Sequence, residues 1–98
     1  MNITKTLDKN VLTIALEGRL DTMTAPQLEE ELKNSMEEAD LLVIDLEKLD
    51  YMSSAGLRVL LSAQKQMAGR GGMKVTHVND IIMEIFEVTG FVDILTIE

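Results

Sequence analysis

Residues 41–67, LLVIDLEKLDYMSSAGLRVLLSAQKQM, decide the fold. The first six are apolar apart from Asp45, which is typical of a strand in the middle of a sheet that is covered on both faces. After Asp50 the apolar residues recur at helical spacing, and Ser53 or Ser54 stands where a helix N-cap is expected. The sequence therefore predicts a buried strand that passes through a short turn, carrying two serines, into an amphipathic helix.

Upstream of this unit the sequence predicts a hairpin and a helix. Residues 3–7 and 11–16 are β-branched or aliphatic runs separated by a polar turn, which is typical of two paired strands. After Gly18, apolar residues follow at helical spacing, and Thr24 with Gln27 resembles a capping box.

Downstream, the glycines within 69–72 end the second helix, and residues 73–78 predict a short strand. A helix that ends at Gly90 and a last strand over 92–97 complete the chain. The predicted order is β-β-α-β-α-β-α-β, an α/β fold with one mixed sheet flanked by helices. Its opening hairpin is antiparallel, and the later strands are parallel with right-handed crossovers. Six apolar side chains are expected in the core: Leu12, Ile14, Val43, Leu60, Ile85 and Phe86.

Size and charge limit the classes of protein that fit. The chain has 98 residues, enough for a single domain over 1–98, and it lacks cysteine, so disulfides and thiolate metal sites are absent. Its formal net charge of −8 repels nucleic acid. No apolar run is long enough to insert into a membrane, and no targeting signal is visible, so we expect a cytoplasmic protein.

Residues for catalysis are scarce. His77 is the only histidine, and the segment MSSAG lacks the glycine spacing of a nucleophile elbow. No phosphate-cradling loop follows a strand, and no carboxylates pair with histidines at metal-ligand spacing. We expect no catalytic residue, metal or cofactor, and therefore a protein that is not an enzyme.

The serine pair is the most informative polar feature that remains. It lies at the expected start of a helix, where free backbone N–H groups and the helix dipole favour negative charge. A phosphoserine there would bring about −1.5 to −2 charges, and Arg58 follows one turn along the same side of the helix. The alternative is that Ser53 and Ser54 act only as capping residues.

Two motifs resemble the anti-sigma-factor antagonists of the STAS domain family, and the resemblance spans nearly the whole chain. One is LEGRLDTMTAPQLEEEL over 16–32, similar to the family's G-x-L-D followed by a T-A-x-x-L helix start. The other is LDYMSSAGLRVLL over 49–61, similar to the family's D-S-[ST]-G-[LI] motif. The resemblance implies a STAS fold and a regulatory function.

The resemblance also implies which residues act. In the family motif the serine directly after the aspartate is phosphorylated, and aligned on Gly56 that serine is Ser54. Ser53 stands where the family usually has aspartate, and Ala55 where it has serine or threonine, so Ser53 is an alternative acceptor. The expected partner-binding residues are Asp21, Thr22, Ser53, Ser54, Gly56 and Arg58. For Asp21, a turn or capping role is the alternative.

By resemblance, the unphosphorylated protein would bind a GHKL-type serine kinase that otherwise holds a sigma factor, and so release the sigma factor. Phosphorylation by that kinase would prevent binding, and a PPM-type serine phosphatase would restore it. A second possibility is an accessory or regulatory STAS subunit of a transporter, such as a lipid-exporting ABC system, in which serine phosphorylation need not occur. For phosphorylation, we expect Ser54 to be more exposed than Leu57, Leu60 and Leu61.

Overall fold

The structure, a computed structural model, describes residues 1–98 as one four-stranded sheet with three helices. The strands and helices follow one another as β1 (Asn2–Asp8), β2 (Val11–Leu20), α1 (Ala25–Ser35), β3 (Leu41–Met52), α2 (Ser54–Met67), β4 (Met73–Thr76) and α3 (Asp80–Thr89). Two short 3-10 turns complete the chain, η1 (Met36–Glu38) after α1 and η2 (Phe91–Asp93) after α3. None of the helices has the length and apolar character needed to cross a membrane.

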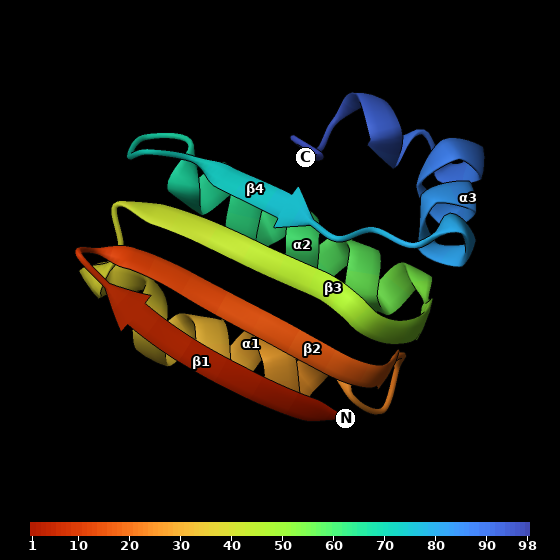
Figure 1. Cartoon of the computed structure of the whole chain (residues 1–98), viewed down its shortest axis with the longest axis horizontal. Helices are drawn as coiled ribbons and strands as arrows, with labels where there is room; N and C mark the ends of the chain where they lie inside the picture. Colours follow the sequence, from red (N-terminus) through yellow and green to blue (C-terminus); the bar gives the residue numbers. More distant parts are fainter.

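The sheet has the order β1-β2-β3-β4 and is mixed. β1 pairs antiparallel with β2, whereas β2 with β3 and β3 with β4 are parallel (Figure 1). Lys9 and Asn10, at the tip of the opening hairpin, both have positive φ, as a tight two-residue turn between antiparallel strands requires. The predicted fold class, with its opening antiparallel hairpin and parallel strands, is confirmed.

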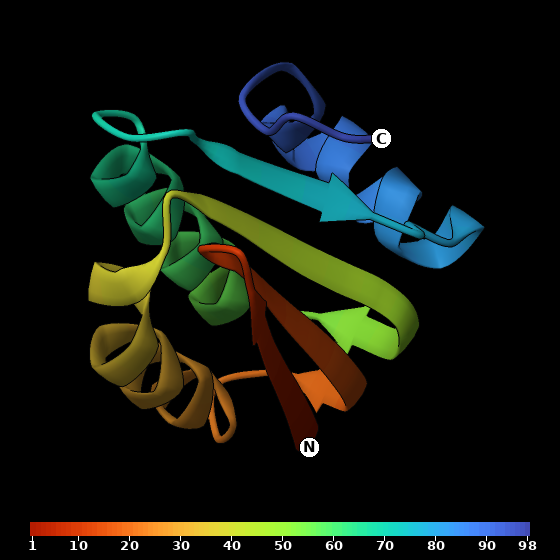
Figure 2. The same ribbon diagram turned by 60° about the vertical axis from the view of Figure 1, so that its left-hand side comes forward.

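Helices α1 and α2 lie on one face of the sheet (Figure 2), and α3 packs beside the carboxyl-terminal half of β3. Side chains of β2 and β3 alternate accordingly: Leu12 and Ile14 are buried, whereas Val43 and Asp45 on the opposite face are only half-buried. No helix covers the face of the sheet on which Val43 lies. The predictions that β3 is covered on both faces and that Val43 is buried were therefore wrong.

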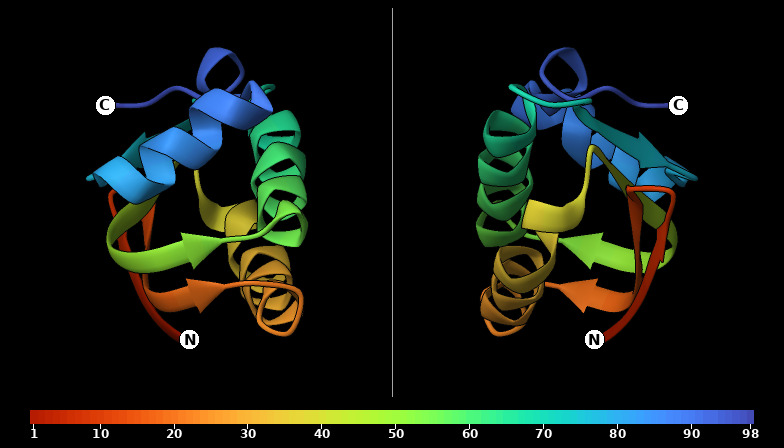
Figure 3. Two further views of the ribbon diagram at one scale, coloured as in Figure 1. Left: turned by 90° about the vertical axis from the view of Figure 1, so that its right-hand side faces the viewer. Right: turned by 90° about the vertical axis from the view of Figure 1, so that its left-hand side faces the viewer.

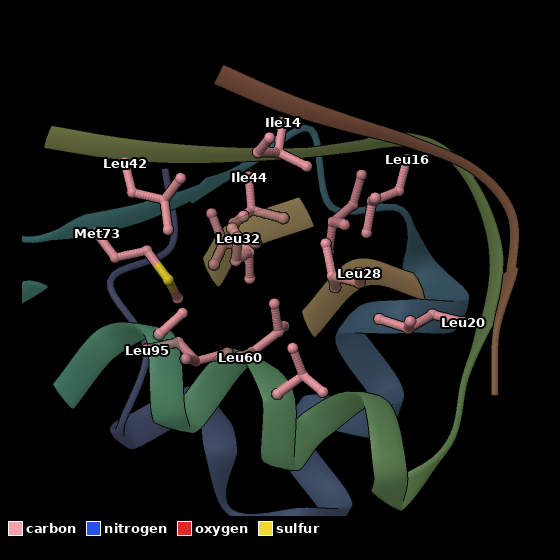
Figure 4. Close-up of a cluster of buried hydrophobic side chains, with 14 of the residues drawn as sticks. Ile14, Leu16, Leu20, Leu28, Leu32, Leu42, Ile44, Leu60, Met73 and Leu95 are labelled. Atoms are coloured by element: carbon pink, nitrogen blue, oxygen red, sulfur yellow. The ribbon is translucent and has the colours of Figure 1, made fainter. Parts of the chain in front are cut away.

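The core fills the space between the sheet and its helices (Figure 4). Leu12, Ile14, Leu60 and Phe86 are buried as predicted, and Leu60 has no exposed surface. Ile85 is only half-buried, because α3 turns Ile82 and Phe86 inward and Ile85 falls beside that face. The sequence pattern indicated the amphipathic helix correctly but misjudged which residues of α3 lie at its inner face.

The last predicted strand, over 92–97, is not formed as a strand. Gly90 ends α3 in the left-handed conformation, with φ 81°, and η2 then winds the chain back so that Leu95 is buried. The tail meets β4 at one parallel bridge between Ile97 and Val75, in which the Val75 N–H donates to the Thr96 carbonyl and the Glu98 N–H donates to the Val75 carbonyl. The tail therefore pairs with the edge strand β4 by a bridge and forms no fifth strand.

Two irregularities bend the carboxyl-terminal half of β3, the part of the strand that leads to the serine pair. β3 carries an extra residue relative to β2 after Asp45 and another after Leu49, and the Asp45 carboxylate accepts a hydrogen bond of 3.0 Å from the Glu47 N–H in the first of them. Such bulges increase local bending and twist. β3 curves strongly toward α2 at its carboxyl end as a result (Figure 1).

Gly56 allows α2 to pack closely against the ends of both neighbouring strands. A Cβ atom at this position would lie 2.6 Å from Leu20 Cγ and 3.1 Å from Met52 Cγ. Leu20 and Met52 are themselves buried, so neither can move aside easily. A side chain here would therefore push the first turn of α2 away from the sheet.

We predict that Gly56→Ala lowers the free energy of unfolding by about 1–3 kcal/mol, the usual cost of overpacking a core. The gain in helix propensity, about 1 kcal/mol, offsets part of this loss. Gly69→Ala is the matched control, because no atom lies within 4 Å of a Cβ there. Urea unfolding of both variants measures the difference, and equal stability of the two would contradict the close packing of Gly56.

Candidate functional site

The two serines at the start of α2 have different environments. Ser53 is the N-cap: its N–H donates to the Leu20 carbonyl at 2.8 Å, and its hydroxyl oxygen accepts from the Gly56 N–H at 3.5 Å. Its side chain is half-buried. The sequence predicted Ser53 or Ser54 as the N-cap, and the structure shows that it is Ser53. The same residue joins the end of β2 to the start of α2.

Ser54 is the first residue of α2 and is exposed. Its hydroxyl makes no hydrogen bond within the chain. Leu57 and Leu60 are buried and Leu61 is half-buried, so the prediction that Ser54 is more exposed than these three leucines is confirmed. The hydroxyl is accessible at a helix N-terminus, where unpaired backbone N–H groups favour negative charge.

Asp21 organises the loop between β2 and α1. Its carboxylate accepts hydrogen bonds from the N–H groups of Met23, at 3.0 Å, and Thr24, at 3.1 Å. Desolvation raises the pKa of this carboxyl, but the hydrogen bonds from Thr24 and Met23 and the charge of Arg19 outweigh it and hold the pKa below its ordinary value. Asp21 therefore has the turn role that the sequence analysis gave as the alternative to partner binding.

Thr24 does not form the predicted capping box with Gln27. Its hydroxyl donates to the Arg19 carbonyl at 2.8 Å and accepts from the Asp21 N–H at 2.9 Å, so it is not available to cap α1. The loop is therefore closed on itself by Asp21 and Thr24. This closure leaves Thr22 and Met23 at the tip exposed, Met23 to 86%.

An Arg–Tyr stack that sequence reasoning missed lies beside this loop. The register of β2 and β3 pairs Arg19 with Tyr51, and the guanidinium carbon lies 4.5 Å from the centre of the Tyr51 ring. Both side chains are partly exposed, and aromatic and arginine side chains are enriched in protein interfaces. Only the bulged register reveals the pair, because a regular pairing would not place these residues opposite one another.

Thr22 and Arg58 come together from the two helix starts. They line one shallow hollow with Ala25, Pro26, Glu29, Ala55 and Val59. The structure thus brings together two surfaces from the predicted set, the Ser53–Ser54 turn with Gly56 and Arg58, and the Asp21–Thr22 loop. Gly56 is buried, and it lets the turn pack closely against the ends of β2 and β3.

The arrangement offers a hydroxyl and charged groups but no general base for it. The one histidine, His77, has its Nδ1 atom 3.2 Å from the Asp45 carboxylate in β3. No group of three or more histidine, aspartate or glutamate side chains is placed to hold a metal ion. An exposed serine hydroxyl of this kind is a group to which a phosphoryl group can be attached.

Known proteins resemble this chain over nearly its full length. The family model described as "Mlab, STAS domain" matches residues 3–96. The anti-sigma-B factor antagonist of Listeria monocytogenes is 35% identical over an alignment 103 positions long, which covers 100% of this chain and 90% of the relative.

Solved structures share the fold. An anti-sigma factor antagonist from Mycobacterium paratuberculosis superposes with a TM-score of 0.89 at 22% identity, over 98% of this chain and 83% of the other. The anti-sigma factor antagonist SpoIIAA in its unphosphorylated form superposes with a TM-score of 0.84 at 15% identity, over 99% of this chain and 88% of the other. The resemblance seen in the two sequence motifs is confirmed by the family match and by these folds, and the chain belongs to the STAS domain family.

Proposed function

We propose that this protein is an anti-sigma factor antagonist whose binding to its partner is controlled by phosphorylation of Ser54. The observation that carries the proposal is the free, exposed hydroxyl of Ser54 at the N-terminus of α2. The motif resemblance aligns this residue with the serine that the family phosphorylates. Relatives named as anti-sigma factor antagonists support it. SpoIIAA, which shares the fold, has also been solved in a phosphorylated form.

The local geometry favours Ser54 over Ser53 as the acceptor. A kinase must reach the hydroxyl, and Ser53 is half-buried with its oxygen directed at the Gly56 N–H. Ser53 occupies the place of the family's aspartate, and both residue types are good N-caps. The substitution therefore keeps the capping role and leaves the neighbouring hydroxyl free.

Phosphate on Ser54 would act by local charge. It would add about −1.5 to −2 charges beside free N–H groups, which favour it, so the domain need not unfold. The same charge would lie in the turn that the Ser53 N–H ties to Leu20, the residue before Asp21, and so within the proposed docking surface. Repulsion and desolvation at an interface of this kind typically weaken binding by several kcal/mol.

In the proposed circuit the partner is a GHKL-type serine kinase that also holds a sigma factor. The unphosphorylated protein occupies the kinase and the sigma factor is released for transcription. A PPM-type phosphatase returns phosphorylated protein to the binding form. This protein then works in the cytoplasm as a binding partner and substrate, and not as an enzyme.

The match to a family model described as "Mlab, STAS domain" favours a second candidate, an accessory or regulatory subunit of a transporter such as a lipid-exporting ABC system. The two candidate functions use the same fold, but they predict different neighbouring genes. A gene for a GHKL kinase or a PPM phosphatase beside this one supports the first. Genes for an ABC ATPase and permease support the second.

We predict that the GHKL-type anti-sigma kinase of the same genome labels Ser54 with phosphate from ATP. Ser54→Ala should abolish labelling and keep binding, whereas Ser53→Ala should still be labelled. Mass spectrometry of the labelled peptides identifies the serine. Phosphate found on Ser53 would contradict the choice of Ser54 as the acceptor. Labelling of neither serine would favour the transporter subunit.

We also predict that Ser54→Asp keeps its melting temperature within a few degrees of the parent but binds the kinase at least about tenfold more weakly. Ser62→Asp is the matched control, because it adds the same charge to an exposed serine farther along α2. Calorimetry measures stability and affinity on the same samples. If both variants lose affinity equally, the effect comes from net charge and the proposed site is wrong.

A further inference from the structure

Helix α3 carries a second apolar face, of which only Ile85 packs against the core. Ile82 and Phe86 are fully buried, which is enough to hold the helix against the fold. Ile81, Ile85 and Val88, at spacings of four and three residues, form another row along the outside, and Ile81 and Val88 are 59% and 77% exposed. Exposed aliphatic residues aligned along one helix are characteristic of interaction surfaces.

A row of carboxylates runs beside this apolar row. The row consists of Asp80, Glu84 and Glu87. Each of these residues directly precedes one residue of the apolar row, so the carboxylates repeat with the same spacing of four and three residues. None of them forms an ion pair in the structure. We call these two rows together, Ile81, Ile85 and Val88 with Asp80, Glu84 and Glu87, the α3 outer face.

No cation of this chain lies within ion-pair distance of these carboxylates. No lysine or arginine follows Lys74 in the sequence, and Lys74 itself pairs with Glu98 at 3.0 Å. Like charges three and four residues apart destabilise a helix, and Glu87 lies near the C-terminal end, where the helix dipole disfavours negative charge. The charge pattern therefore lacks a complement within this protein.

The α3 outer face is open to a partner. Figure 3 shows α3 on the outside of the molecule, with no other element covering its outer side. The turn η2 follows it with two further exposed aliphatic side chains, Val92 and Ile94. The apolar surface thus continues beyond the helix, and all the charged residues from Asp80 to Glu98 are acidic.

From this pattern we propose that the α3 outer face docks a basic amphipathic helix of another protein. The apolar row packs against an apolar ridge of the partner, and its lysines or arginines pair with Asp80, Glu84 and Glu87. A second copy of this chain would place carboxylates against carboxylates, and nucleic acid or an anionic membrane would be repelled in the same way. This surface is distinct from the serine turn and does not depend on phosphorylation of Ser54.

A synthetic amphipathic peptide of leucine and lysine, about four turns long, is the probe. Added to the isotope-labelled protein, it should shift amide NMR signals between Asp80 and Ile94, whereas the counterpart peptide of leucine and glutamate should shift none. Val88→Ser, and separately the double variant Glu84→Gln/Glu87→Gln, should each weaken binding of the basic peptide at least about tenfold. Ser54→Asp should leave this binding unchanged.

The matched control is Glu30→Gln/Glu38→Gln, which removes two exposed carboxylates from another part of the surface. Equal weakening in the two double variants would mean unspecific charge attraction and would overturn the proposal. Signal shifts away from α3 and η2 would overturn it as well. Sedimentation that shows a dimer of the parent, lost in Val88→Ser, would instead assign the face to a second copy. Melting temperatures of all variants verify that each is folded.

Discussion

The junction at Ser53 positions everything around the candidate site. One backbone hydrogen bond, from the Ser53 N–H to the Leu20 carbonyl, ties the end of β2 to the start of α2. Gly56 lets the helix approach Leu20 and Met52 closely enough for that bond to form. Because β2 leads into the loop at Asp21, the same bond places that loop and the serine turn side by side. The site therefore depends on packing between the ends of two strands and one helix.

This construction separates the residues that hold the fold from those of the proposed binding surface. Ser53 and Gly56 are engaged in capping and packing, whereas the side chain of the neighbouring Ser54 is exposed and makes no hydrogen bond within the chain. Asp21 uses its carboxylate to close its own loop, so that Thr22 and Met23 are the side chains presented outward. A charge can be added at Ser54 without removing any contact that holds the domain together, which is the physical requirement for a reversible switch.

Much of this arrangement could be predicted from the sequence, because period-2 and helical apolar patterns, caps and Gly90 act locally. The order of elements and the exposed serine at a helix start followed from such signals. Two errors concern long-range packing: Val43 faces a side of the sheet that no helix covers, and burial of Leu95 prevents a regular last strand. One local signal also failed, because the Thr24 hydroxyl bonds within the loop before α1 and does not cap the helix. The Arg19–Tyr51 stack depends on bulges, which no local pattern reveals.

Hydrogen–deuterium exchange of the protein, with and without phosphate on Ser54, tests the central claim most directly. If the phosphate acts by local charge on a preformed surface, exchange will change only in the loop after β2 and in the first turn of α2. The amides of β2, β3 and the inner turns of α2 will keep their protection. Faster exchange throughout β3 and α2 in the phosphorylated protein would show that the switch works by unfolding, and would contradict the account.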